Sequence, residues 1–203
     1  MNLPRTRRQK LDMVRKHVLD DIWEIIKARN LAEPLISAPS LNWVKSDAKP
    51  AAQFLRMQLS RHVILVLTRL NAIPGKGKTG NTACIMSVLD EAVAIDILSD
   101  KDRARFADRL NTMKVNMANQ GTSFSDLVNF RNSELAHSLY DLKVGVGALS
   151  YFVISQFSEA TVELVSDIES HLVSLGCDPV ADIGQFDKAW AKCGTDFWAL
   201  LTP

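Results

Sequence analysis

The 203-residue chain has only three cysteines, Cys84, Cys177 and Cys193, and no two of them form a C-x-x-C pair. This set provides neither a zinc-finger signature nor an even number for a disulfide framework, and it suits a reducing compartment. The chain also lacks the H-E-x-x-H spacing, and its one E-x-x-H, Glu134 to His137, has no second copy with which helices of a bundle could build a metal site. The sequence therefore predicts no metal and no cofactor.

Long apolar runs are missing as well. Acidic residues interrupt the basic N-terminal stretch at Asp12, Asp20, Asp21 and Glu24. The stretch therefore lacks the continuous apolar segment of a secretory signal peptide, and its acidic residues also disfavour a transit peptide. No apolar run approaches the roughly 20 residues that a membrane-spanning helix needs. We expect a cytoplasmic protein that makes no membrane contact.

The overall charge is nearly balanced, but its distribution is uneven. The formal net charge is +1, with 47% hydrophobic and 23% charged residues, which is enough apolar content for a sizeable core. Basic residues gather near the N-terminus: Arg5, Arg7, Arg8, Lys10, Arg15 and Lys16. This cluster has two interpretations, a surface that contacts an anionic partner such as nucleic acid, or a solvated helix start.

Apolar residues recur at helical spacing along almost the whole chain. The expected helices cover about 8–30, 50–72, 82–98, a segment capped by Ser99, 124–140, 145–175, and one or two short helices in 182–201. Pro34 and Pro39 predict an irregular link after the first helix, and Gly176 predicts the end of the sixth. With no repeat and no convincing set of strands, we expect an all-α antiparallel bundle forming one domain over 1–203. Its core would cover about 8–175 and its helical tail 178–203.

Three stripes of apolar residues are predicted to face the core. They are Leu11, Val14, Val18, Ile22, Ile25 and Ile26 in the first helix; Phe54, Leu55, Leu59, Val63, Val66, Leu67 and Leu70 in the second; and Leu149, Phe152, Val153, Phe157, Val162, Val165, Ile168 and Leu172 in the sixth.

The stretch NAIPGKGKTGNT, residues 71–82, carries the Gly-Lys-Thr end of a phosphate-binding loop. The first glycine of that motif is replaced by Ala72, and no other strands are expected to build a parallel sheet around it. A helix–helix loop is therefore favoured over a nucleotide site. Lys76 and Lys78 remain candidates for RNA contact because loops often carry binding residues.

A second stretch, FRNSELAHSLY over 130–140, places Arg131, Asn132, His137 and Tyr140 within one helical segment. Arginine offers a fork of donors for phosphate, and histidine exchanges protons near neutral pH. These groups suit RNA transphosphorylation, in which the ribose 2′-OH attacks the adjacent phosphate. One motif supplies one histidine, so a twofold dimer would supply the acid and the base together. The alternative is that Arg131 and His137 are ordinary surface or buried polar residues.

RNSELAH, together with TRLNAIPGKGKTGNTACIMSVL, resembles the HEPN superfamily and within it the abortive-infection AbiU-type branch. The resemblance covers about residues 10–175. It implies a HEPN-like four-helix core with additional short helices, in a protein that is commonly dimeric. It also implies a metal-independent endoribonuclease of a toxin or anti-phage system. An antitoxin or regulatory protein is then a candidate partner. His137 would be the acid/base, Arg131 the phosphate-binding group, and Asn132 and Tyr140 supporting residues. Tyr140 lies three residues after the histidine, where the related toxin branch has its tyrosine two after. Some superfamily members serve only as binding modules, so a non-catalytic module that binds RNA or a protein is the alternative.

Overall fold

The computed structural model describes residues 6–37, 42, 44–72, 83–137, 150–180 and 182–202. These residues form seven α-helices and no strand, so the expected all-α fold is confirmed. The helices are α1 (Arg7–Ser37), α2 (Lys49–Leu70), α3 (Ile85–Val93), α4 (Asp100–Asn119), α5 (Phe124–His137), α6 (Tyr151–Ser174) and α7 (Ile183–Ala199).

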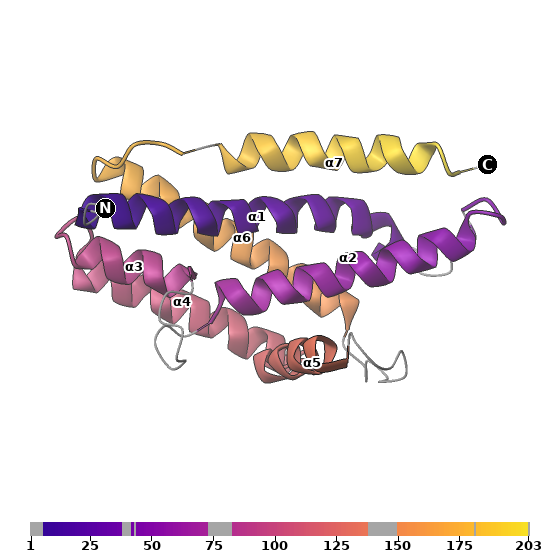
Figure 1. Ribbon diagram of the computed structural model, residues 1–203, viewed down its shortest axis with the longest axis horizontal. Coiled ribbons are helices and arrows are strands. Elements are labelled where there is room, and N and C mark those ends of the chain that lie inside the picture. Colours follow the sequence, from indigo (N-terminus) through magenta and orange to yellow (C-terminus); the bar gives the residue numbers. More distant parts are fainter. Residues whose placement is uncertain are drawn as a thin grey trace, which may run out of the picture.

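The long helix α1 lies at the centre of the bundle, in contact with α2, α3, α6 and α7 (Figure 1). Its predicted apolar stripe is confirmed, because Leu11, Ile22, Ile25 and Ile26 are fully buried and Val14 and Val18 nearly so. The helices α2 and α6 run antiparallel to α1. Successive contacts show this direction. Along α1, Asp21 pairs with Arg69 and Glu24 with the earlier His62 of α2. Likewise Arg8 contacts Gly176, just after α6, and Arg15 pairs with the earlier Glu169.

Two aromatic residues predicted in the core are exposed instead. Phe54 and Phe152 each expose 61% of their surface. Both point away from the bundle, because Val153 and Ile154 beside Phe152 in α6, and Ala52 near Phe54 in α2, are buried at the same helix ends. The later positions of the same stripes, such as Leu67 and Leu172, are fully buried. The predicted stripes are therefore too wide, since they include these two positions outside the buried face.

The irregular link predicted at Pro34 is wrong, because α1 continues through this proline to Ser37. Proline has no N–H for the carbonyl of Asn30, one helical turn earlier. The helix α7 packs at this point: a Cβ at Gly194 would collide with the Asn30 backbone oxygen, so only glycine permits this approach. The indole of Trp198 donates to the Leu31 carbonyl at 2.8 Å. The tail is therefore one helix docked along α1.

The ends of the other helices follow local signals. Ser99 caps α4 by accepting a hydrogen bond from the Asp102 amide, as expected. Pro50 occupies the first turn of α2, where its missing N–H costs nothing. Gly176 adopts φ +91° and ends α6, a conformation that favours glycine. The third helix is shorter than predicted, since Asp96 turns to φ 57° and the amides of the next two residues bond back to the Ala92 carbonyl.

Candidate functional site

The helix α5, which carries the RNSELAH motif, begins at a capping box. The Ser123 hydroxyl accepts a hydrogen bond from the Asp126 amide at 3.2 Å, and the Asp126 carboxylate accepts one from the Ser123 amide at 2.7 Å. This reciprocal arrangement satisfies two backbone donors at the helix start. The hydrogen bonds from Ser123 lower the pKa of the Asp126 carboxyl. The start of α5 is thus fixed by an ionised aspartate.

We expect the contribution of Asp126 to stability to disappear in acid. A carboxyl whose pKa is lower in the folded state stabilises the fold above its unfolded pKa of about 3.9, and this contribution is lost as pH falls through the folded pKa. Asp126→Asn should therefore unfold at a lower temperature than the wild type at pH 7, and the difference should shrink towards pH 3. Thermal unfolding across this range measures it. The exposed Asp108→Asn is the control, and the same trend in both variants would contradict the assignment.

A partly buried lysine holds α5 against the rest of the bundle. Lys114 of α4 donates to the Asn71 carbonyl at the end of α2, at 2.9 Å. Its ammonium also lies 4.5 Å from the ring centre of Phe124, the first residue of α5. Burial lowers the pKa of the Lys114 ammonium. One side chain of α4 therefore joins the end of α2 to the start of α5.

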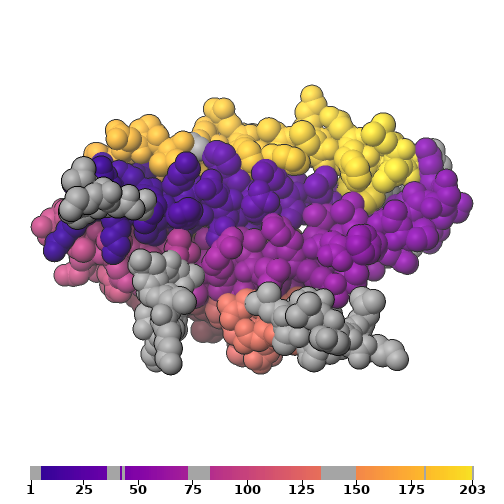
Figure 2. Space-filling model, in the orientation of Figure 1, coloured from indigo at the N-terminus to yellow at the C-terminus, as the bar shows by residue number. Residues whose placement is uncertain are grey.

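The second half of α5 separates an apolar side from a polar side. Leu127 and Phe130 are buried, whereas Arg131 is partly exposed and Asn132 is exposed. The Asn132 amide oxygen accepts hydrogen bonds from Arg131 Nη2 at 2.9 Å and from Nε at 3.2 Å. The sequence places these two residues side by side, and the structure shows that the amide orients the guanidinium directly. The pair is not sealed inside the bundle, since α5 lies at its lower edge in Figures 1 and 2.

His137 is the last residue of α5. It stands six positions after Arg131, which corresponds to ~9 Å along the helix axis. The negative end of the helix dipole is at this terminus, where positive charge is favoured. The side chain of His137 lies outside the described residues, as do the supporting Tyr140 and the two loop lysines, Lys76 and Lys78.

The segments beside the Gly-Lys-Thr stretch are helical, as the loop interpretation expects. The apolar run before this stretch, residues 62–67, lies inside α2. The apolar residues after it that precede an aspartate, residues 92–96, begin inside α3. A phosphate-binding loop follows a strand, and neither segment is one. Asn81, near the end of this stretch, lies outside the described residues, and Cys84 is the residue that precedes α3.

Several basic residues near the N-terminus contact other parts of the same chain. Arg7 donates to the Ala94 carbonyl at 3.1 Å, and Arg8 donates to the Gly176 carbonyl at 3.2 Å. Lys10 pairs with Glu91. Arg15, of which 1% of the side chain is exposed, bonds to Glu169 at 2.7 and 3.1 Å. Four of the six residues of the cluster therefore contact other parts of the chain, and two of these, Lys10 and Arg15, have carboxylate partners. These contacts weaken the interpretation as an anion-binding surface.

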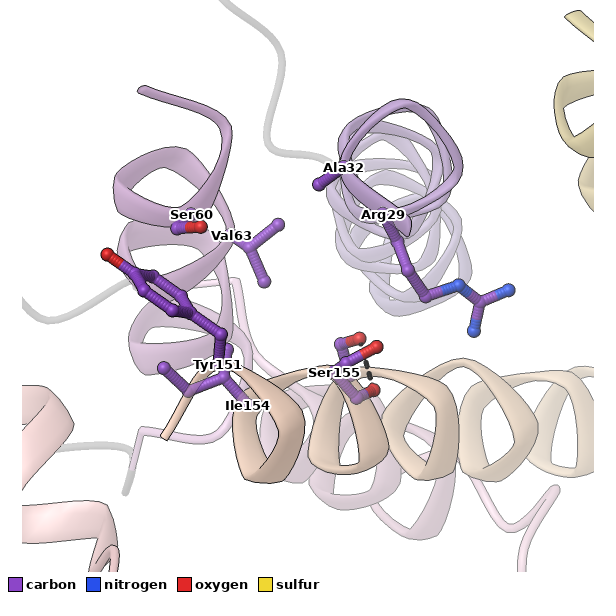
Figure 3. A pocket seen from close by; sticks show the side chains of 8 residues that line it. Arg29, Ala32, Ser60, Val63, Tyr151, Ile154 and Ser155 are labelled. Atoms are coloured by element: carbon purple, nitrogen blue, oxygen red, sulfur yellow. Dashed lines mark hydrogen bonds between the residues drawn. The ribbon is translucent and has the colours of Figure 1, made fainter. Parts of the chain in front are cut away.

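A small cavity between α1, α2 and α6 is shown in Figure 3. Its volume is about 20 Å³, which is about the space that one water molecule requires. The Ser60 hydroxyl is buried there without a hydrogen-bond partner, while the Ser158 hydroxyl donates to the Ser155 carbonyl at 2.7 Å. The cavity is too small for an organic ligand in this conformation.

Sequence reasoning missed a larger groove of about 490 Å³ between α4 and α6. It is lined by Arg105, Phe106, Arg109, Asp167, Ser170, His171 and Ser174. The sequence interpretation treats His171 as an ordinary helix-face residue. The spacings R-x-x-x-R and D-x-x-S-H-x-x-S, each of which defines one helix face, are the signal that could have identified the groove.

Within the described part of the chain, no three His, Cys, Asp or Glu side chains are grouped so that they could hold a metal ion. None of the helices described is at once long and apolar enough to cross a bilayer. Comparisons of the chain with protein-family models, with curated proteins and with solved structures find no match.

Proposed function

We propose that the protein is a metal-independent endoribonuclease of the HEPN type, with its catalytic site at the C-terminal half of α5. The observation that supports this most is the exposed Arg131–Asn132 pair, six residues ahead of a histidine that ends the helix. A guanidinium held by a neighbouring amide presents its remaining N–H donors in a fixed direction. Such a fork matches the two free oxygens of a phosphodiester.

The reaction requires a base and an acid on opposite sides of one phosphate. The base takes the proton of the ribose 2′-OH, whose oxygen forms a bond to phosphorus, while the bond from phosphorus to the 5′-oxygen breaks. The acid protonates this departing oxygen, leaving a 2′,3′-cyclic phosphate and a 5′-hydroxyl. His137 of one copy would serve as the base and His137 of a second copy as the acid. The two Arg131 side chains would stabilise the negative charge of the transition state.

A twofold arrangement of this kind needs an accessible α5. The helix packs against α2 and α4 on its buried side, and Asp126, Asn129 and Asn132 on its other side are exposed. A second copy could therefore approach the motif without any rearrangement of the core. The homodimer, the RNA substrate and a toxin or anti-phage role belong to this proposal, as does a regulatory protein that controls it.

The proposal is tested by incubating the purified full chain with single-stranded RNA in the presence of EDTA. We expect the RNA to be cut, and DNA of the same sequence to stay intact because it has no 2′-OH. Dependence of cutting on an added divalent ion, or equal cutting of the DNA, would contradict the proposal.

The second candidate function is a non-catalytic module that binds RNA or a partner protein. It is favoured by the absence of a second histidine from the described residues around Arg131. This function predicts that the RNA is retained intact by the protein, with an affinity that His137→Ala does not change.

A further inference from the structure

The groove between α4 and α6 is built from one face of each helix. Arg105 and Arg109 are four residues apart on α4, and Asp167, His171 and Ser174 follow at four- and three-residue steps on α6. Residues at these spacings lie on the same side of a helix. The helices run antiparallel here, since Asp102 pairs with His171 while Arg109 pairs with Asp167. Two arginines therefore face a histidine and two serines across the groove.

The arginines are held by carboxylates at the surface. Arg109 Nη1 lies 2.5 Å from Asp167 Oδ2, and their side chains expose 43% and 55% of their areas. Arg105 Nη2 lies 3.3 Å from Asp102 Oδ1. Ion pairs this exposed contribute only about 0–1 kcal/mol, so a stronger anion can replace the carboxylate at low cost.

His171 adds an unsatisfied nitrogen beside these arginines. Its Nε2 is shielded from solvent and makes no hydrogen bond, and the nearest carboxylate oxygen, on Asp102, is 3.6 Å away. The ring packs against Phe106, with centres 5.8 Å apart. The Ser174 hydroxyl donates to the His171 carbonyl at 2.7 Å, which fixes the helix turn that carries it. A ligand oxygen that binds this nitrogen would therefore compete with the Asp102 carboxylate.

We propose that this groove binds the phosphate group of a phosphorylated small molecule. The dianion would replace Asp167 on Arg109, with Arg105 and His171 as further donors. A carboxylate ligand would gain little, because it carries the same single charge as the group it displaces, whereas a phosphate monoester carries nearly two. The groove of about 490 Å³ corresponds to roughly sixteen water molecules at about 30 Å³ each, which leaves room for an organic part beside the phosphate.

The proposal is tested by titrating the full chain with adenosine 5′-monophosphate, inorganic phosphate and adenosine at low salt, followed by calorimetry and amide chemical shifts. We expect the monophosphate to bind with shifts confined to the groove, inorganic phosphate to bind more weakly, and adenosine not to bind. Equal affinity for inorganic phosphate and the monophosphate would overturn the ester assignment. Binding of adenosine as tight as that of its phosphate, or no saturable binding of either phosphate, would overturn the site.

Three variants separate this site from general charge effects. Arg109→Gln should weaken binding by about tenfold or more, since it removes one charge-assisted fork. Asp167→Asn should strengthen binding severalfold, because it removes the carboxylate that the phosphate must displace. Arg103→Gln is the matched control: Arg103 is also on α4 and paired at the surface, with Asp90 at 2.7 Å, but it does not line the groove. Weaker binding in Asp167→Asn, or equal losses in Arg103→Gln and Arg109→Gln, would contradict the proposal. These readouts involve no RNA, so they do not depend on the proposed ribonuclease.

Discussion

His137→Ala should reduce RNA cutting by about 10²–10⁴-fold, the usual contribution of a general acid or base. Each composite site would lose both its proton donor and its proton acceptor, while the phosphate-binding arginines would remain. RNA binding should therefore persist when cutting is lost. Initial cutting rates of a labelled RNA in EDTA, measured together with affinity for the same RNA, give both values.

Three further variants make this result specific. His17→Ala, on an exposed part of α1, should cut RNA at the wild-type rate. Arg131→Lys should cut more slowly than the wild type but faster than Arg131→Ala, because lysine keeps the charge and loses the fork. Circular dichroism and the oligomeric state should be unchanged in all four variants. Unchanged cutting in His137→Ala would contradict the assignment of the catalytic residue.

Glu169→Ala should destabilise the fold by about 3–5 kcal/mol, because it leaves the Arg15 guanidinium buried without its partner. Burial lowers the pKa of this guanidinium, but the hydrogen bond and charge of Glu169 outweigh it, so that its pKa lies above the usual value. Arg15 also donates to the Asp178 carbonyl at 3.1 Å. The pair therefore joins α1, α6 and the turn after α6, and urea unfolding measures its contribution.

The control for this prediction is an exposed pair of the same chemistry. Asp90→Asn, which removes the partner of Arg103 at the surface, should change the unfolding free energy by at most about 1 kcal/mol. The double variant Arg15→Met with Glu169→Leu should recover much of the stability lost in Glu169→Ala, since no charge is then buried. A loss in Glu169→Ala no larger than that in Asp90→Asn would contradict the structural role of the pair.

The helices could be predicted from the sequence because their apolar spacing is a local property. The stripe from Leu11 to Ile26 and the stop at Gly176 depend only on neighbouring residues. The continuation of α1 through Pro34 could not be predicted in this way, because the close approach of α7 at Gly194 accompanies it and lies far away in the chain. The exposure of Phe54 likewise depends on which side of α2 the other helices cover.

The same distinction between local and long-range information applies to the two candidate sites. Arg131, Asn132 and His137 lie within seven residues of each other, so the motif is visible in the sequence. Only the structure shows that Arg131 and Asn132 contact each other on the outer side of α5. The groove between α4 and α6 brings together Arg109 and His171, which are 62 residues apart. Residue spacing marks one face of each helix, but only the structure shows that these two faces meet. Similarly, the internal partners of the basic N-terminal residues could not be identified from composition.

The chemistry of the cut ends tests the ribonuclease proposal most directly. The wild-type protein in EDTA should convert a short RNA into one product with a 2′,3′-cyclic phosphate and one with a 5′-hydroxyl, identified by mass spectrometry. A substrate with a single 2′-deoxyribose at the cut position should not be cleaved there. Products with 3′-hydroxyl and 5′-phosphate ends, or cleavage at the deoxyribose, would contradict attack by the 2′-OH and with it the proposed role of His137 and Arg131.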